Sequence, residues 1–139
     1  MNGEVITDEQ LVALAKEAMS ASYSPYSGFR VGAALLTADE AVFQGANIEN
    51  MSFGATNCAE RTAIFKAVSE GYRDFSAIAI AGGSAGIVTE ACYPCGICRQ
   101  VMSEFCKPGF RILLATADGY EIHTLEELLP GTAVAELMN

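Results

Sequence analysis

The stretch NCAERTAIFKA, residues 57–67, predicts an amphipathic helix. Ala63 and Ala67 lie four residues apart, and neighbouring aliphatic residues extend the same apolar face. That face is sufficient to pack a helix against a sheet. The first turn nevertheless carries a thiol at Cys58 and a carboxylate at Glu60. We therefore expect this helix to supply reactive groups as well as part of the core.

The segments around this helix predict one mixed sheet covered by helices. Short apolar or β-rich runs separated by turn residues are typical of strands, and capping boxes mark the first and last helices. In chain order we expect a helix from Thr7, boxed by Gln10, to about Ser22; strands over 29–37 and 41–49 that form an antiparallel hairpin; a helix over 58–71; a strand over 76–82; a helix over 95–105; strands over 110–116 and 120–124; and a helix from Thr124, boxed by Glu127, that ends before Pro130. This order indicates an α/β fold.

The composition favours a single domain over residues 1–139, which we expect to be catalytic. The chain is 51% hydrophobic, and single domains typically contain about 100 to 150 residues. Eight Lys and Arg against 17 Asp and Glu give a net charge of −9. This is the opposite sign to that of proteins that neutralise a phosphate backbone, so we expect no nucleic-acid partner.

The cellular setting also follows from composition. The start of the chain, MNGEVITDEQ, lacks the basic and then apolar order of a secretory signal, and no run approaches the roughly 18 apolar residues of a membrane span. We expect a cytoplasmic protein with no membrane partner. In that compartment its five cysteines are thiols or metal ligands rather than disulfides.

Residues 91–100, ACYPCGICRQ, place three cysteines at intervals of three: Cys92, Cys95 and Cys98. A ferredoxin-type cluster needs a further cysteine where Met102 stands, so the sequence excludes it. A thioredoxin-like redox pair of Cys95 and Cys98 remains open. A structural zinc held by these three cysteines together with Cys58 also remains open.

Glu60 favours a catalytic zinc over a structural one. A structural zinc with four cysteine ligands has no need of a carboxylate two residues from one ligand. A catalytic zinc has three protein ligands, keeps a position for water and needs a proton carrier nearby. The segments CAE (residues 58–60) and PCGIC (residues 94–98) supply both requirements, and each begins a predicted helix. Their combination is the residue pattern of zinc deaminases that act on bases.

Four blocks then identify a family resemblance. SPYSGFRVGAAL, GANIEN, NCAERTA and PCGICRQV resemble the short, homotetrameric cytidine deaminases in order and spacing, and the likeness runs from about Ser24 to Pro130. The resemblance implies a three-layer α/β/α sandwich with a five-stranded mixed sheet. It also implies one Zn²⁺ per chain, held by Cys58, Cys95 and Cys98, with Glu60 as the catalytic proton shuttle.

The resemblance further implies substrate contacts and a supporting shell around the metal. It implies that the pyrimidine nucleoside is bound by Phe29, Asn47, Glu49 and Ala59, with Phe53 contributed by a neighbouring subunit. Two helix N-termini, together with Arg61 and Arg99 beside the ligands in sequence, can offset the excess charge of three thiolates. Pro94 completes the shell around the ligands. Simpler roles also exist: core packing for Phe29, a polar strand end for Asn47 and Glu49, and a solvated surface charge for Arg99.

Some positions depart from the family pattern or stand outside it. Met51 and Phe53 occupy positions where relatives usually carry alanine and tyrosine, and GTAV follows LLP where an aromatic residue is common. Cys92 is close enough in sequence to compete for zinc. We expect Cys106 to be a small core residue, and His123, the single histidine, to be a half-exposed residue of an edge strand.

The expected activity is zinc-dependent hydrolytic deamination of cytidine and 2'-deoxycytidine to uridine and 2'-deoxyuridine, a reaction of pyrimidine salvage. One alternative is a related deaminase of another aminopyrimidine or of an N4-substituted cytidine. An alternative from a different class is a non-catalytic structural-zinc or thiol-switch protein. Because the blocks that resemble the pocket carry few basic residues, we expect the free nucleoside to be favoured over nucleotides and polymers.

Overall fold

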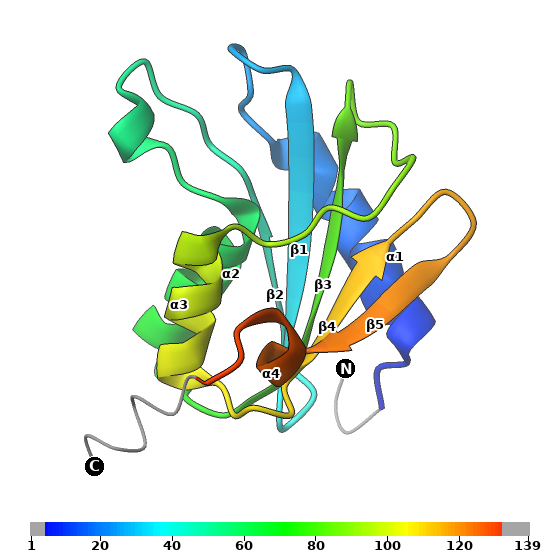
Figure 1. The fold of residues 1–139 in the computed structure, drawn as a ribbon, viewed down its shortest axis with the longest axis vertical. Helices are drawn as coiled ribbons and strands as arrows, with labels where there is room; N and C mark the ends of the chain where they lie inside the picture. The colour runs from blue at the N-terminus through cyan, green and yellow to red at the C-terminus, as the bar shows by residue number, and fades with distance from the viewer. Residues whose placement is uncertain (1–4, 132–139) are drawn as a thin grey trace.

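The computed structural model describes residues 5–131, and its centre is the predicted five-stranded mixed sheet (Figure 1). The strand order is β2-β1-β3-β4-β5, and only β3 and β4 are parallel neighbours. The strands are β1 (Phe29–Thr37), β2 (Val42–Ala46), β3 (Phe75–Ser84), β4 (Arg111–Ala115) and β5 (Tyr120–Thr124). The antiparallel hairpin of β1 and β2 is therefore confirmed.

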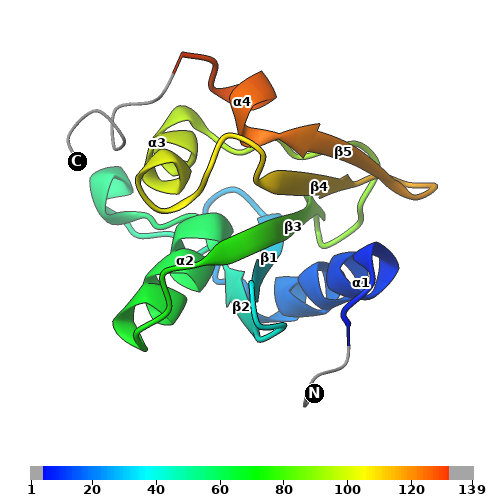
Figure 2. The same cartoon turned by 90° about the horizontal axis from the view of Figure 1, so that it is seen from below.

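Helices cover both faces of the sheet, which confirms the three-layer arrangement (Figure 2). The helices are α1 (Asp8–Ala18), followed by the 3₁₀ turn η1 (Met19–Ala21); η2 (Phe53–Ala55); α2 (Ala59–Ser69); α3 (Gly96–Phe105); and α4 (Leu125–Leu128). Both predicted capping boxes, Thr7 with Gln10 and Thr124 with Glu127, are present. Among residues 5–131, no helix has the length and apolar content needed to cross a bilayer.

Alternation along the strands produces two separate cores. In β3, Ile78 and Ile80 pack with α2, α3 and α4, whereas Ala77 and Ala79 pack with α1. Both sets are fully buried, as expected for a central strand that is covered on each face. The small residues on the α1 side let that helix lie close to the sheet. A Cβ added at Gly32 would lie 2.1 Å from the carbonyl oxygen of Ala15.

Gly45 in β2 determines how closely the first turn of α2 approaches the sheet. A Cβ added there would lie 2.6 Å from both the carbonyl oxygen of Ala59 and the backbone nitrogen of Ala63. Real Cβ atoms do not tolerate backbone contacts this short, so only glycine fits without moving the helix. The start of α2, where Cys58 and Glu60 lie, is therefore fixed directly by backbone packing.

The strand β2 ends at Ala46, three residues earlier than predicted. The side chain of Asn47 takes over part of the pairing with β1: its Oδ1 accepts from the backbone N–H of Val31 at 2.9 Å, and its Nδ2 donates to the carbonyl oxygen of Phe29 at 2.9 Å. The chain then continues through isolated bridges at Ile48. The prediction that Asn47 and Glu49 lie on one strand was wrong. The backbone N–H of Asn47 still donates to the carbonyl oxygen of Val31 at 3.1 Å, but the N–H of Val31 bonds the side chain of Asn47 in place of its carbonyl.

Candidate metal and catalytic site

Three cysteine sulfurs converge where two helices begin. Cys58 is the N-cap residue of α2, Cys95 is the N-cap residue of α3, and Cys98 lies in the first turn of α3. The Sγ atoms of Cys58 and Cys95 are 3.8 Å apart, and those of Cys95 and Cys98 are 3.5 Å apart. All three lie within 4.8 Å of one another. The site therefore joins two segments that are 37 residues apart in the chain.

The spacing and chemistry of this group fit a zinc ion. Thiolates bound to one tetrahedral zinc at about 2.3 Å lie about 3.8 Å from each other, close to the separations observed. Among the described residues, the group has three members, and neither Cys92 nor Cys106 belongs to it. This three-ligand set leaves one tetrahedral position for water or substrate. The alternative of four cysteine ligands is not supported.

The remaining two cysteines belong to the core. Burial raises the pKa of Cys106 to about 12 and that of Cys92 to about 11, so both remain neutral thiols near neutral pH. Cys106 packs against the larger core, as predicted. Cys92 packs over β3: a Cβ added at Gly82 would lie 2.9 Å from its Sγ.

Arg61 lies against the sulfur cluster. Its NH2 group donates to Cys58 Sγ at 3.3 Å, and its buried Nε has no hydrogen-bond partner within residues 5–131. Hydrogen bonding with Cys98 and with Arg61 lowers the pKa of Cys58 to about 5. A cationic donor beside a thiolate offsets part of the negative charge that three cysteine ligands would concentrate here.

Arg99 makes different contacts from those of Arg61. Its Nε donates to the carbonyl oxygen of Pro94 at 2.8 Å, and its NH1 donates to the carbonyl oxygen of Leu128 at 2.7 Å. Neither of these bonds reaches a sulfur atom. The side chain of Pro94 is fully buried. Arg99 therefore ties the segment before Cys95 to the end of α4, rather than covering the sulfurs.

Glu60 is a buried carboxyl group in the first turn of α2, with 4% of its surface exposed. Burial is the main reason that its pKa is raised to about 7, and the nearby Cys58 charge adds to the rise. Its position at a helix N-terminus favours the ionised form in the opposite direction. A carboxyl with this pKa has both protonation states available near neutral pH, as a proton shuttle requires.

Phe29 lies on the face of the sheet that carries α2 and α3. It opens β1, two residues before the core residue Val31, and it is 38% exposed. A Cβ added at Gly82 would lie 3.1 Å from its ring. A hollow of about 370 Å³ borders the ring and is formed with the end of β3 and the segment after it. The next residue, Arg30, lies near Gly86.

Asn47 and Glu49 are held by a turn that precedes β1. Ser22 Oγ donates to Asn47 Oδ1 at 2.5 Å. The backbone N–H groups of Tyr26 and Ser27 donate to Glu49 Oε1 at 3.0 and 3.1 Å, and the Ser27 hydroxyl donates to its other oxygen. These bonds lower the pKa of Glu49, the Ser27 hydroxyl having the largest effect. Sequence reasoning missed both serines, although they lie in the turn-rich segment before Phe29.

The segment with Asn47 and Glu49 is joined directly to the start of α2. Ile48, which lies between Asn47 and Glu49 in sequence, pairs with Asn57 through two backbone hydrogen bonds of 2.9 Å. Asn57 immediately precedes Cys58. Glu49 also lines a separate hollow of about 320 Å³ with Tyr26, Ser27, Phe53 and Thr56. Phe53, at 77% exposure, contacts Tyr26 at a ring-centre distance of 6.4 Å.

Comparison with known proteins agrees with this fold and this site. The family model described as the cytidine and deoxycytidylate deaminase zinc-binding region matches residues 5–113. The cytidine deaminase of Halalkalibacterium halodurans is 51% identical over 133 residues, which cover 94% of this chain and 97% of the relative. That of Sporosarcina psychrophila is 48% identical over 124 residues, 88% of each chain.

A solved structure gives the same result. The crystal structure of cytidine deaminase from Burkholderia pseudomallei superposes with a TM-score of 0.83 at 44% identity, covering 90% of this chain and 98% of that chain. The fold and the site are those of a zinc-dependent deaminase. The chain belongs to the cytidine and deoxycytidylate deaminase family. It is therefore an enzyme, and the alternatives of a structural-zinc or thiol-switch protein are not supported.

The ligand set leads to a prediction about metal content. Cys92→Ser should retain one zinc per chain, because the Cys92 sulfur lies outside the three-membered cluster. Cys58→Ser should lose most of the metal, because two thiols cannot complete the site. Zinc per chain after extensive dialysis, measured by plasma mass spectrometry, checks both. Loss of zinc from Cys92→Ser together with its retention by Cys58→Ser would show that the ligand set is wrong.

Proposed function

We propose that this enzyme hydrolyses cytidine and 2'-deoxycytidine to uridine and 2'-deoxyuridine with release of ammonia, as a cytoplasmic step of pyrimidine salvage. The observation that carries the proposal is the convergence of Cys58, Cys95 and Cys98 with the buried carboxyl of Glu60 two residues from one of the thiols. The similarity to proteins named cytidine deaminases supports the choice of substrate. Residues 1–139 act as one catalytic domain.

Each group has a defined part in the reaction. Cys58, Cys95 and Cys98 would hold one zinc ion, which would supply a nucleophile derived from water at neutral pH by lowering the pKa of water. Glu60 accepts the proton of that water and delivers it to ring N3. Glu60 then takes the proton of the new hydroxyl at C4 and gives it to N4, so that the C4=O bond forms as the C4–N4 bond breaks and ammonia leaves. Addition of one water and loss of one ammonia balance the step.

The residues beside the sulfurs stabilise this arrangement electrostatically. Arg61 offsets the charge of the thiolates through its bond to Cys58. The N-termini of α2 and α3, which Cys58 and Cys95 cap, add partial positive charge next to the cluster. Arg99 and Pro94 act indirectly: the hydrogen bond between them fixes the backbone that leads into Cys95. A less negative ligand set would make zinc a stronger Lewis acid, which lowers the pKa of bound water further.

The nucleoside is held by groups that surround this centre. Phe29 packs on the pyrimidine ring, and Ala59 offers backbone groups at the first position of α2, where N–H groups point out of the helix end. Asn47 and Glu49 bind the ribose hydroxyls. The serine and backbone bonds already made by these two side chains orient them, and Asn47 keeps a second amide N–H for the ligand.

Assembly into a homotetramer completes the pocket. Met51 and Phe53 are 82% and 77% exposed, and both lie in the segment after Glu49. Apolar side chains this exposed are typical of surfaces that meet a partner. Phe53 then closes the pocket of a neighbouring subunit. Of the GTAV segment that follows LLP, where relatives commonly carry an aromatic residue, Gly131 is the last described residue, and residues 132–134 lie outside the described range.

The first prediction from this mechanism concerns Glu60. Glu60→Gln should keep zinc and the fold, because the amide has the same shape, and should lower kcat by about 10²- to 10⁴-fold, the range expected for loss of an acid–base group. Ultraviolet absorbance of cytidine measures turnover, and metal content and circular dichroism provide the controls. Turnover close to that of the wild type would remove Glu60 from the mechanism.

A second prediction concerns the substrate. The described residues that line the two hollows beside Phe29 and Glu49 include no lysine or arginine, and Glu49 and Glu90 add negative charge there. Binding of a 5'-phosphate normally uses arginine or lysine. Comparison of kcat/KM should therefore favour cytidine over cytidine 5'-monophosphate and over a cytosine-containing single strand at two salt concentrations. Equal use of the monophosphate would contradict the proposal, and preference for an N4-substituted cytidine would favour the related-deaminase alternative.

A third prediction tests whether Phe53 acts in a neighbouring subunit. Phe53→Ala chains and Glu60→Gln chains should each be weakly active alone. Oligomers that contain both should recover activity, because Glu60→Gln chains supply Phe53 to pockets that retain Glu60. Co-expression with two affinity tags isolates the mixed oligomers, and light scattering measures their mass. The matched control combines Glu60→Gln chains with Cys95→Ser chains, and these oligomers should not recover activity, because every pocket lacks either Glu60 or a zinc ligand. A measured mass of one chain, or no recovery in oligomers of Phe53→Ala and Glu60→Gln chains, would contradict shared pockets.

A further inference from the structure

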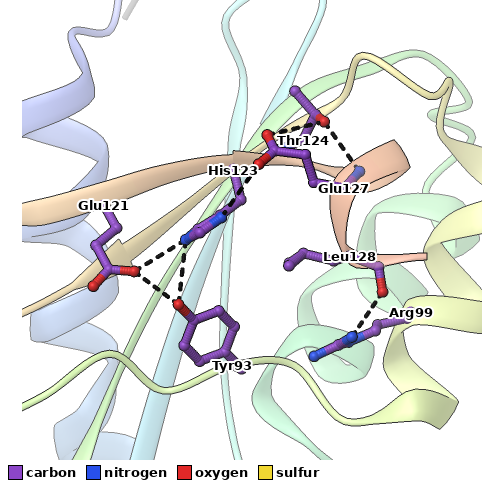
Figure 3. Close-up of polar contacts among 7 residues, drawn as sticks. All are labelled: Tyr93, Arg99, Glu121, His123, Thr124, Glu127 and Leu128. Atoms are coloured by element: carbon purple, nitrogen blue, oxygen red, sulfur yellow. Dashed lines mark hydrogen bonds and ion pairs between the residues drawn. The ribbon is translucent and has the colours of Figure 1, made fainter. Parts of the chain in front are cut away.

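Tyr93 joins the segment before Cys95 to the edge of the sheet (Figure 3). Its hydroxyl donates to Glu121 Oε1 at 2.9 Å, and its ring centre lies 5.4 Å from that of His123. Glu121 and His123 belong to β5, whereas Tyr93 lies two residues before Cys95. This contact spans 28 residues of sequence. No step of the proposed mechanism uses it.

The partners of Tyr93 are themselves held in place. His123 Nε2 lies 3.0 Å from Glu121 Oε1, and His123 Nδ1 lies 3.7 Å from Glu127 Oε2. Glu127 in turn accepts from the backbone N–H of Thr124 at 2.9 Å as part of the α4 capping box. Tyr93 is therefore anchored to a connected group of side chains and not to one mobile surface residue.

The link from Tyr93 to Cys95 is short and stiff. Only Pro94 lies between them, and its buried ring fixes one backbone angle. A residue before proline is also restricted to extended conformations. The carbonyl oxygen of Pro94 is held by Arg99, which also bonds the carbonyl of Leu128 at the end of α4. Movement of Tyr93 would thus be transmitted to Cys95.

Cys95 is the cysteine of the cluster that packing restrains least. Cys98 is fully buried within α3, and Cys58 is partly buried and bonded by Arg61. Cys95 is exposed. Its Sγ lies 3.8 and 3.5 Å from those of Cys58 and Cys98. A restraint on its backbone therefore affects the whole ligand set.

We propose that Tyr93 is a positioning residue for the metal site: its contact with Glu121 and His123 holds Cys95 in the ligand geometry and slows release of zinc. The proposal rests on the ligand set proposed above. Residues that orient metal ligands commonly change metal affinity by about 10- to 100-fold when they are replaced. An exposed hydrogen bond of this kind contributes little to global stability, so its effect should be local.

The chain supplies a matched control on β5, the strand that carries Glu121 and His123. Tyr120 opens β5, and its hydroxyl donates to Glu9 Oε2 at 2.9 Å, as Tyr93 does to Glu121. This second bond reaches α1 on the opposite face of the sheet, away from the cysteines. Tyr93→Phe and Tyr120→Phe therefore each remove one tyrosine–glutamate hydrogen bond, but only the first lies next to the metal site.

Release of zinc from the purified zinc-loaded protein into excess chromogenic chelator tests the proposal. Tyr93→Phe, which keeps the ring contact, should release zinc about 10-fold faster than the wild type, and Tyr93→Ala should release it faster still. Tyr120→Phe should remain within about 2-fold. Thermal unfolding of all variants monitors global stability. Absorption of the cobalt(II)-substituted proteins reports ligand geometry and should change for Tyr93→Ala but not for Tyr120→Phe.

The outcomes distinguish the role of Tyr93, whose contact with Glu121 and His123 we call the clamp, from the ligand set itself. If the wild type retains zinc and Tyr93→Ala releases zinc at the same rate as the wild type, the clamp is overturned and the ligand set is not. Equal acceleration by Tyr93→Phe and Tyr120→Phe would also overturn it, because that result would reflect general loosening. A wild-type protein that holds no zinc would overturn the ligand set and the clamp together. Faster release confined to the Tyr93 variants, with a changed cobalt spectrum, would establish the role.

Discussion

The structure depends on bringing two helix N-termini to the same edge of one sheet. Strands β2 and β3 both pair antiparallel with β1, so they run in the same direction. Helix α2 follows β2 and helix α3 follows β3, and each therefore begins near the carboxyl end of a strand at that shared edge, the usual place for a site in such sheets. Cys58 and Cys95 cap these helices. The partial positive charge of both helix ends then faces the cluster of thiols, whose mutual repulsion would otherwise oppose their approach.

Local patterns were sufficient to predict most of this framework. The capping boxes at Thr7 and Thr124, the alternating strands and the apolar helix faces each depend on residues a few positions apart. The cysteine cluster was predictable because each half of the motif, CAE at residues 58–60 and PCGIC at residues 94–98, places its groups at short spacings, whereas the catalytic role of Glu60 stays a prediction. The comparisons then support the family to which these motifs pointed. These features are encoded in short segments, so one sequence reveals them.

The features that the sequence did not reveal depend on side chains far apart in the chain. Asn47 ends β2 early because it bonds the backbone of β1 at Phe29 and Val31. Arg99 reaches the carbonyl of Leu128, 29 residues away, although its neighbour in sequence is a cysteine of the cluster. The contacts of Tyr93 with β5 are equally non-local. Such pairs leave no periodic signal, because either residue alone is an ordinary loop or surface residue.

The burial of Glu60 shows how stability and chemistry oppose each other at this edge. Desolvation makes the charged form costly, which is why the pKa of the carboxyl is raised to about 7. A glutamine would relieve that cost, but it could not carry a proton. The close packing of α2 on Gly45 keeps the first turn at the sheet and so keeps the carboxyl buried. The same packing therefore raises the free-energy cost of ionising Glu60 and holds it in the first turn of the helix that Cys58 caps, where the proposed mechanism requires a group that accepts and returns a proton.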